Sequence, residues 1–204
     1  IRRDQGMGNI TYPLSSRPPP SSAIAMIAVD QLVISGNRLL DDTAGLLAVR
    51  DWLYAGGRLW IMLDKTGMEL PSRLLGDQFN IHLVDEVSLQ QLAISEEGED
   101  REPLIRHFDE PGMQPVTLSR VLLDGQHVSH RVGDWPVACW QSVGQGEVLF
   151  TMLSMDAWVR PMAVGDGVNV TRPLKSLAER FLQKRQPAVL GQEKLRSFVA
   201  EQIG

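Results

Sequence analysis

Hydrophobic and polar positions follow two different repeats along this chain, and each repeat predicts its own kind of structure. Residues 31–35 and 58–63 are short apolar runs, as is typical of buried strands. Between them, apolar side chains recur at helical spacing over residues 43–55, after the capping residue Asp42 and before Gly56. Strand, capped helix and strand make a βαβ unit. Continuous apolar strands predict a parallel sheet that is covered on both faces.

The middle of the chain is less regular. Residues 68–76 are predicted to form a helix, and residues 79–84 read as a third strand. Residues 95–115 are polar and acidic, so we expect a loop or an insertion there.

From residue 116 the apolar positions repeat every second residue, which is typical of strands that are buried on one face. This repeat predicts one β-hairpin over residues 116–132 and another over residues 136–153. Residues 173–183 return to helical spacing. The pattern as a whole predicts an α/β fold with a mainly parallel sheet and β-hairpin additions in the C-terminal half.

Composition changes along the chain suggest three parts. Residues 1–22 are rich in Gly, Pro, Ser and Arg, and are expected to form an extended linker or an N-terminal strap. Residues 23–185 form the α/β domain, and residues 186–204 form a helical segment that we expect to start a following domain. Because the chain begins at Ile1, we expect it to be a piece of a longer polypeptide.

Overall composition narrows the class of protein. Of 204 residues, 43% are hydrophobic and 22% are charged, which is typical of soluble globular domains. The net charge of −5 argues against a nucleic-acid partner, which would favour a basic chain. Cys139 is the only cysteine, so no intrachain disulfide is possible; its apolar neighbours predict a buried structural thiol.

Few residues have the spacing of a metal or cofactor site. His127 and His130 are three positions apart on a predicted strand, so they point to opposite faces and cannot share a metal ion. The glycines at residues 144–146 join two predicted strands, whereas a phosphate-binding loop joins a strand to a helix. We therefore expect neither a metal nor a cofactor.

Five tryptophans raise the alternative of a carbohydrate-binding surface. Trp52 and Trp60 lie in core patterns, whereas Trp135, Trp140 and Trp158 lie near predicted loops and hairpins. Packing in the core and at its edges is the commoner role of such side chains. The sequence leaves open whether any of them is an exposed platform.

Three stretches together carry a family resemblance. They are residues 30–34, residues 49–59 and residues 144–150, followed by Asp156 and Trp158. The pattern resembles the class I glutamine amidotransferase-like superfamily. More narrowly, it resembles divergent domains of that fold in the extracytoplasmic parts of uncharacterised bacterial membrane proteins.

The resemblance spans about residues 23–185 and implies a flavodoxin-like sheet with helices on both faces. Active members of the superfamily place a nucleophilic cysteine in a tight turn after a strand, together with a late histidine and an acid. The matching turn here, residues 64–67, holds no cysteine, and no histidine follows His130. Cys139 falls in a predicted hairpin instead. The resemblance therefore implies the fold without the family's chemistry.

These observations lead to a predicted function. We expect a non-catalytic ligand-binding or protein-interaction domain of a larger protein. A hydrolase of unknown substrate is the alternative. Ligands of open α/β sheets bind at the carboxyl ends of the strands. The candidate ligand-facing residues there are Ser35, Asp64, Lys65, Thr66 and Asp156.

Partners and location follow from the resemblance alone. It implies a membrane-associated parent protein with this domain on the extracytoplasmic face of a bacterial membrane. The expected partner is another protein or a neighbouring domain of the same chain. Contact with the membrane is expected only through segments outside this sequence.

Overall fold

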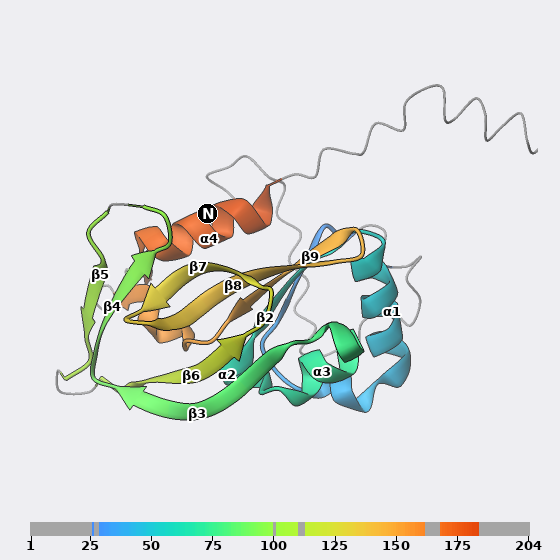
Figure 1. The fold of residues 1–204 in the computed structure, drawn as a ribbon, viewed down its shortest axis with the longest axis horizontal. Coiled ribbons are helices and arrows are strands. Elements are labelled where there is room, and N and C mark those ends of the chain that lie inside the picture. Colours follow the sequence, from blue (N-terminus) through green and yellow to red (C-terminus); the bar gives the residue numbers. More distant parts are fainter. Residues whose placement is uncertain (1–25, 27–28, 100, 110–112, 162–167, 184–204) are drawn as a thin grey trace, which may run out of the picture.

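The fold begins with two parallel strands that are joined by a capped helix (Figure 1). The computed structural model describes residues 26, 29–99, 101–109, 113–161 and 168–183. Strands β1 (Gln31–Ile34) and β2 (Arg58–Met62) pair in parallel and α1 (Thr43–Tyr54) connects them, which confirms the predicted βαβ unit. The Asp42 carboxylate accepts a 2.9 Å hydrogen bond from the Gly45 amide, so the predicted cap is formed.

A close backbone contact at the end of α1 determines where strand β9 (Gly146–Thr151) begins. A Cβ atom at Gly146 would lie 2.2 Å from the Leu53 carbonyl oxygen and 2.5 Å from that of Gly57. Only glycine lets the backbones approach this closely. The turn at residues 144–146 therefore also serves as a packing contact between the helix and the sheet.

Within the described residues, the central sheet has seven strands and is only partly parallel. Beyond β9 it contains β8 (Trp135–Val143), β7 (His127–Val132), β4 (Gln91–Glu96) and β5 (Leu104–His107). In the order β1-β2-β9-β8-β7-β4-β5, the first three strands are parallel and each later pair is antiparallel. The prediction of a mainly parallel sheet is therefore wrong. The tight β8–β9 hairpin, which was predicted correctly, reverses the direction, and the sheet continues from β8.

Strands β3 (Ile81–Leu89) and β6 (Val116–Leu123) form a separate two-stranded antiparallel ribbon, which curves beside the main sheet (Figure 1). The predicted hairpin over residues 116–132 is therefore wrong, because β6 pairs with β3 whereas β7 pairs with β8 and β4. A turn is present at Gly125, which has a φ of 86°. The turn leads the chain from one sheet to the other instead of closing a hairpin.

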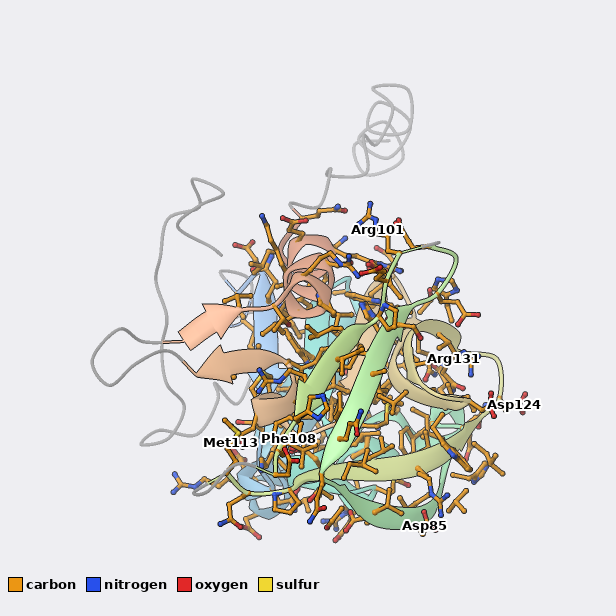
Figure 2. All side chains as sticks on the ribbon, turned by 90° about the vertical axis from the view of Figure 1, so that its left-hand side faces the viewer. Asp85, Arg101, Phe108, Met113, Asp124 and Arg131 are labelled. Atoms are coloured by element: carbon orange, nitrogen blue, oxygen red, sulfur yellow. The ribbon has the colours of Figure 1, made fainter. Side chains whose placement is uncertain are left out.

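The acidic segment of residues 95–115 was predicted to be a loop, yet it contains β5 and the end of β4. The Arg131 guanidinium of β7, labelled in Figure 2, lies 2.7 Å from the Glu97 carboxylate. The Ser176 hydroxyl donates a hydrogen bond to the Glu96 carboxylate. Arg131 and Ser176 are distant from this segment in the sequence, so the local sequence does not reveal that its acidic side chains have partners.

Helices cover both faces of the parallel strands, as predicted. On one face, the Phe181 ring of α4 (Arg172–Leu182) meets the Trp60 ring edge to face at 5.5 Å, and the Trp60 indole donates to the Thr151 hydroxyl. Side chains alternate along β9, so Gly146 and Thr151 face opposite sides. The helix α1 that contacts Gly146 therefore lies on the other face, and α3 (Glu69–Leu75) packs beside it.

Shorter elements complete the described part of the chain. They are α2 (Leu63–Thr66) and the antiparallel pair β10 (Val159–Pro161) and β11 (Val168–Val170). The predicted strap at residues 1–22 and the predicted helical segment at residues 186–204 lie outside the described residues. The three-part division of the chain therefore stays a prediction.

Candidate functional site at the carboxyl edge of the parallel strands

The carboxyl ends of β1, β2 and β9 lie at one edge of the sheet, because the three strands are parallel neighbours. Ser35 follows β1, α2 follows β2, and a 3-10 turn (Met155–Ala157) lies shortly after β9. The β3–β6 ribbon joins this region, since the Ser119 amide of β6 donates a 2.9 Å hydrogen bond to the Met152 carbonyl. All five predicted ligand-facing residues thus belong to connections at this edge.

Asp64 is the most unusual residue of the edge. Its side chain is 2% exposed, and neither carboxylate oxygen has a hydrogen-bond partner among the residues that the structure describes. The Lys65 ammonium forms an ion pair with Oδ2 at 3.4 Å, outside hydrogen-bonding geometry, and the Lys65 side chain itself is 54% exposed. A buried carboxylate normally accepts hydrogen bonds from several donors, which offset the cost of removing its charge from water. Among the described residues, Asp64 has no such donors in hydrogen-bonding geometry.

Burial raises the pKa of the Asp64 carboxyl above its ordinary value of 3.8. The positive charge of Lys65 opposes that shift, and the negative charge of Asp156 adds to it. The two aspartates at this edge therefore sense each other electrostatically, although they are far apart in the sequence.

The remaining predicted residues differ in what their side chains do. Thr66 is 1% exposed, and its hydroxyl donates to a main-chain carbonyl, with those of Met62 and Gly67 each 3.1 Å away. It therefore stabilises the turn. Ser35 and Asp156 are exposed to solvent at the same edge.

Arg106 of β5 is a member of this region that the sequence did not indicate. It is 8% exposed, and its Nη2 atom donates a 3.4 Å hydrogen bond to the main-chain carbonyl of Asp156. Its guanidinium carbon also lies 5.0 Å from the centre of the Phe108 ring. Arg106 belongs to a segment whose polar sequence predicts a loop, so no local signal indicates its place at the sheet edge.

Cys139 lies elsewhere, within β8, with no solvent exposure. Burial raises the pKa of its thiol far above the ordinary value, so it is not poised as a thiolate nucleophile. The prediction that Cys139 is a buried structural thiol is confirmed.

The two histidines of β7 behave as their strand spacing predicted. His127 is exposed, whereas His130 is 1% exposed and burial lowers its pKa to about 4. Among the residues that the structure describes, no group of three or more His, Cys, Asp or Glu side chains is arranged to hold a metal ion.

The tryptophans pack inside the molecule. Trp52, Trp60, Trp140 and Trp158 are each at most 7% exposed. Trp135 is half-buried, and the Arg120 guanidinium lies 4.8 Å from its ring centre. The structure thus favours packing over an exposed carbohydrate platform for these side chains.

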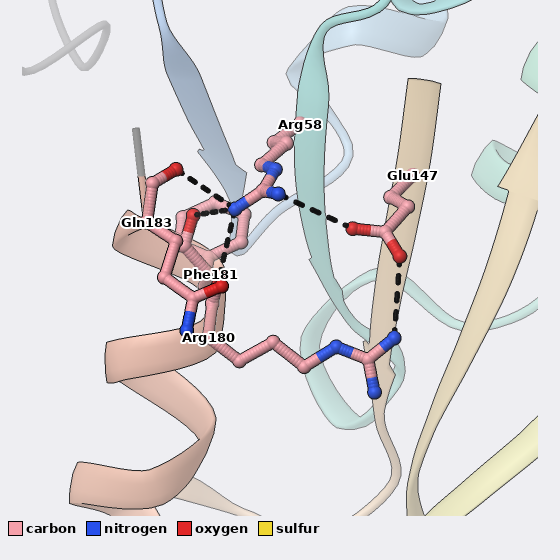
Figure 3. Close-up of polar contacts among 5 residues, drawn as sticks. All are labelled: Arg58, Glu147, Arg180, Phe181 and Gln183. Carbon is pink, nitrogen blue, oxygen red and sulfur yellow. Dashed lines mark hydrogen bonds and ion pairs between the residues drawn. The ribbon is translucent and has the colours of Figure 1, made fainter. Parts of the chain in front are cut away.

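A second polar cluster lies at the opposite, amino edge of β2 and β9, and Figure 3 shows its contacts. The Arg58 guanidinium donates to the main-chain carbonyls of Arg180 at 2.7 Å, Phe181 at 3.3 Å and Gln183 at 2.9 Å. The Glu147 carboxylate forms ion pairs with Arg58 at 3.7 Å and Arg180 at 3.2 Å. Every group in this cluster has a partner, so its role is to hold the end of α4 on the sheet.

Comparison with known proteins shows fold similarity without a sequence family. No family model and no curated protein matches the sequence. The cytoplasmic protein STM1381 from Salmonella typhimurium LT2 superposes with a TM-score of 0.53 at 16% identity, over 73% of this chain and 71% of that chain. The cytoplasmic protein STM3548 from Salmonella typhimurium gives 0.54 at 13% identity, over 74% and 71%.

A β-galactosidase from the Antarctic haloarchaeon Halorubrum lacusprofundi gives a TM-score of 0.47 at 14% identity, over 75% of this chain but 21% of its own. No described helix of the present chain is long and apolar enough to cross a membrane. At these identities, the two Salmonella structures show that this chain shares their α/β fold, and they say nothing about its activity.

Proposed function

We propose that this chain is a non-catalytic binding domain whose ligand docks at the carboxyl edge of β1, β2 and β9. The observation that carries the proposal is Asp64, a carboxylate with a 2% exposed side chain and no hydrogen-bond partner among the described residues. Leaving a buried polar group unpaired costs about 1–3 kcal/mol of stability. A ligand that supplies donors would remove this cost, and open α/β sheets bind ligands at this edge.

The absence of acyl-transfer chemistry is part of the proposal. Glutamine hydrolysis by an amidotransferase needs a thiolate beside a base. The only cysteine, Cys139, is buried in β8 and does not belong to the residue 64–67 turn. These features support a domain that keeps the fold of the amidotransferase-like superfamily and binds without turnover.

A fragment screen by two-dimensional NMR tests the proposed site. We expect small polar fragments to shift the amide signals of residues 63–67 and 154–157 in the wild-type domain. The Asp64→Asn variant should lose these shifts. The control Asp77→Asn changes an exposed aspartate outside the edge and should keep them. If the fragments shift other surfaces or none, or if Asp64→Asn binds them as the wild type does, the proposed site is wrong.

We further propose, on the family resemblance alone, that the parent protein is membrane-associated and exposes this domain on the extracytoplasmic face. Its partner would then be a protein or a neighbouring domain. Protease treatment of spheroplasts that express the full parent protein tests the location. Digestion of the domain in intact spheroplasts is expected, and protection until lysis would contradict it.

A further inference from the structure

We propose that the group recognised at Asp64 is a guanidinium group. This inference rests on the proposed function, since it takes the carboxyl edge to be the binding site and names the chemistry of its ligand. It is carried by three observations: the two unpaired oxygens of one buried carboxylate, the exposed ammonium beside it, and the second carboxylate nearby.

The first observation concerns geometry. Both Oδ1 and Oδ2 of Asp64 lack a hydrogen-bond partner among the described residues and are shielded from solvent, so the proposed ligand has to displace the exposed Lys65 ammonium to reach them. A carboxylate whose two oxygens both lack hydrogen bonds matches two parallel N–H donors in one plane. A guanidinium group presents that fork, whereas an ammonium group acts as a compact point charge.

The second observation is the neighbour that now partly compensates Asp64. The Lys65 ammonium lies 3.4 Å from Oδ2 and leaves Oδ1 without any hydrogen bond. The Lys65 side chain is 54% exposed, so rotating it into solvent requires no repacking of the core. Lys65 therefore acts as a displaceable internal cation in the place that a ligand cation would take.

The third observation is the surrounding charge. Asp156 is exposed, and its negative charge acts on Asp64. Arg106 brings a positive charge to the same region and donates a 3.4 Å hydrogen bond to the Asp156 main-chain carbonyl. The chain as a whole carries a net charge of −5, which favours the approach of cations over anions.

Three probes of matched size distinguish a guanidinium site from a general cation site and from a neutral polar site. They are n-butylguanidinium, n-butylammonium and neutral n-butylurea. Their binding is followed through the amide signals of Lys65 and Thr66 in the wild-type domain. We expect butylguanidinium to bind about tenfold more tightly than butylammonium, because only the former makes both hydrogen bonds. Butylurea should bind more weakly than either cation.

Variants test which residue is responsible. Asp64→Asn should weaken butylguanidinium binding about tenfold or more, because the charge-assisted acceptors are lost. Lys65→Gln should tighten the same binding, since it removes the internal competitor. The two variants act in opposite directions, so a general loss of folding cannot mimic the pair of results. Asp77→Asn, an exposed aspartate outside the edge, should bind as the wild type does.

The capped peptide acetyl-Gly-Arg-Gly-amide identifies the source of the group. Binding tighter than that of butylguanidinium assigns it to an arginine of a protein partner, and weaker binding assigns it to a small guanidine. Equal binding of butylguanidinium and butylammonium, or no effect of Asp64→Asn, would overturn the inference. If the guanidinium inference is overturned but neutral fragments still bind at residues 63–67, the proposed binding function stands without it. If no fragment binds at those residues, both the guanidinium inference and the proposed binding function fail.

Discussion

At the scale of single residues, Asp64 and Asp85 show how surroundings decide the behaviour of the same side chain. Each aspartate has a cationic neighbour. The Arg120 guanidinium hydrogen-bonds Asp85, which lowers the pKa of that carboxyl, and the Asp85 side chain is 42% exposed. The Asp64 side chain is 2% exposed, and this burial outweighs the effect of Lys65, so the pKa of the Asp64 carboxyl is raised instead. Of these two aspartates, Asp64 is the one in an unfavourable environment, which is why we assign it a function.

The Asp64→Asn variant should be more stable than the wild type at neutral pH. The folded-state pKa of Asp64 lies above the unfolded value of 3.8, so its ionised form destabilises the fold above the folded-state pKa. The neutral amide removes this cost, with a gain of about 1–3 kcal/mol. As pH falls through the folded-state pKa, the wild type should gain the same stability by protonation and the difference should close. Denaturant unfolding at several pH values measures this; a less stable variant at neutral pH would contradict it.

The lowered pKa of His130 predicts that folding stability changes with pH in the opposite direction to the change predicted for Asp64. Burial lowers its pKa from 6.5 to about 4, the Glu96 carboxylate opposes the shift and Arg172 adds to it. Between these values the unfolded chain takes up a proton that the folded chain does not, so stability falls as pH drops from 6.5 to 4. The loss amounts to about 3 kcal/mol. Denaturant unfolding of the wild type and His130→Gln should show a shallower pH slope in the variant; equal slopes would contradict the assignment.

At the scale of elements, α4 depends on an arginine from a strand. The last carbonyls of a helix have no partner within it, and here Arg58 of β2 supplies donors to three of them (Figure 3). Arg180 packs over the Trp140 ring, 4.2 Å from its centre, and contacts Glu147. The end of α4 is thus fixed to the sheet by contacts that the helical repeat does not predict.

Arg58→Met should loosen the last turn of α4. It removes three hydrogen bonds from a charged donor, so we expect a loss of about 1–3 kcal/mol and faster amide hydrogen exchange at residues 180–183. The control Arg101→Met alters an ion pair with Glu99 in which both side chains are largely exposed, and should change stability by less than about 0.5 kcal/mol. Unchanged exchange in the last turn of Arg58→Met would show that the cluster does not hold the helix.

Local elements were predictable from the sequence because their signals are local. The Asp42 cap, the apolar repeat and the glycines after α1 define that helix within a few residues. Strand partners were less predictable. The turn at Gly125 suggested that β6 and β7 pair with each other, but each finds its partner in a distant segment. An alternating pattern identifies a strand without identifying its neighbour.

At the scale of the whole molecule, the edge that holds the candidate site was predictable and its chemistry was not. A βαβ unit directs attention to the carboxyl ends of its strands, which is how Asp64 and Asp156 were selected. The burial of Asp64 depends on the packing around α2, which includes the β3–β6 ribbon that the sequence analysis missed. Arg106, which contacts the Asp156 main chain at this edge, belongs to β5, within a segment predicted to be a loop. Both depend on contacts between residues far apart in the chain.

The whole-molecule account predicts that the domain does not hydrolyse glutamine. Its only thiol is fully buried, and burial raises the pKa of that thiol, so no thiolate is available at neutral pH. Incubation with glutamine should release no ammonia above background, and Cys139→Ser should give the same result as the wild type. Ammonia release that disappears in Cys139→Ser would identify Cys139 as a nucleophile and overturn the account.

The most direct test of the central claim is the pKa of Asp64 itself, measured in the free domain by following the side-chain carboxyl carbon signals through a pH titration by NMR. The account predicts that Asp64 titrates above 3.8, because the burial of its carboxylate outweighs the favourable charge of Lys65. Asp85 should titrate below 3.8 in the same experiment, because Arg120 stabilises its charge. An Asp64 pKa at or below 3.8 would mean that its charge is already satisfied within the protein, and would contradict its role as a ligand-binding group.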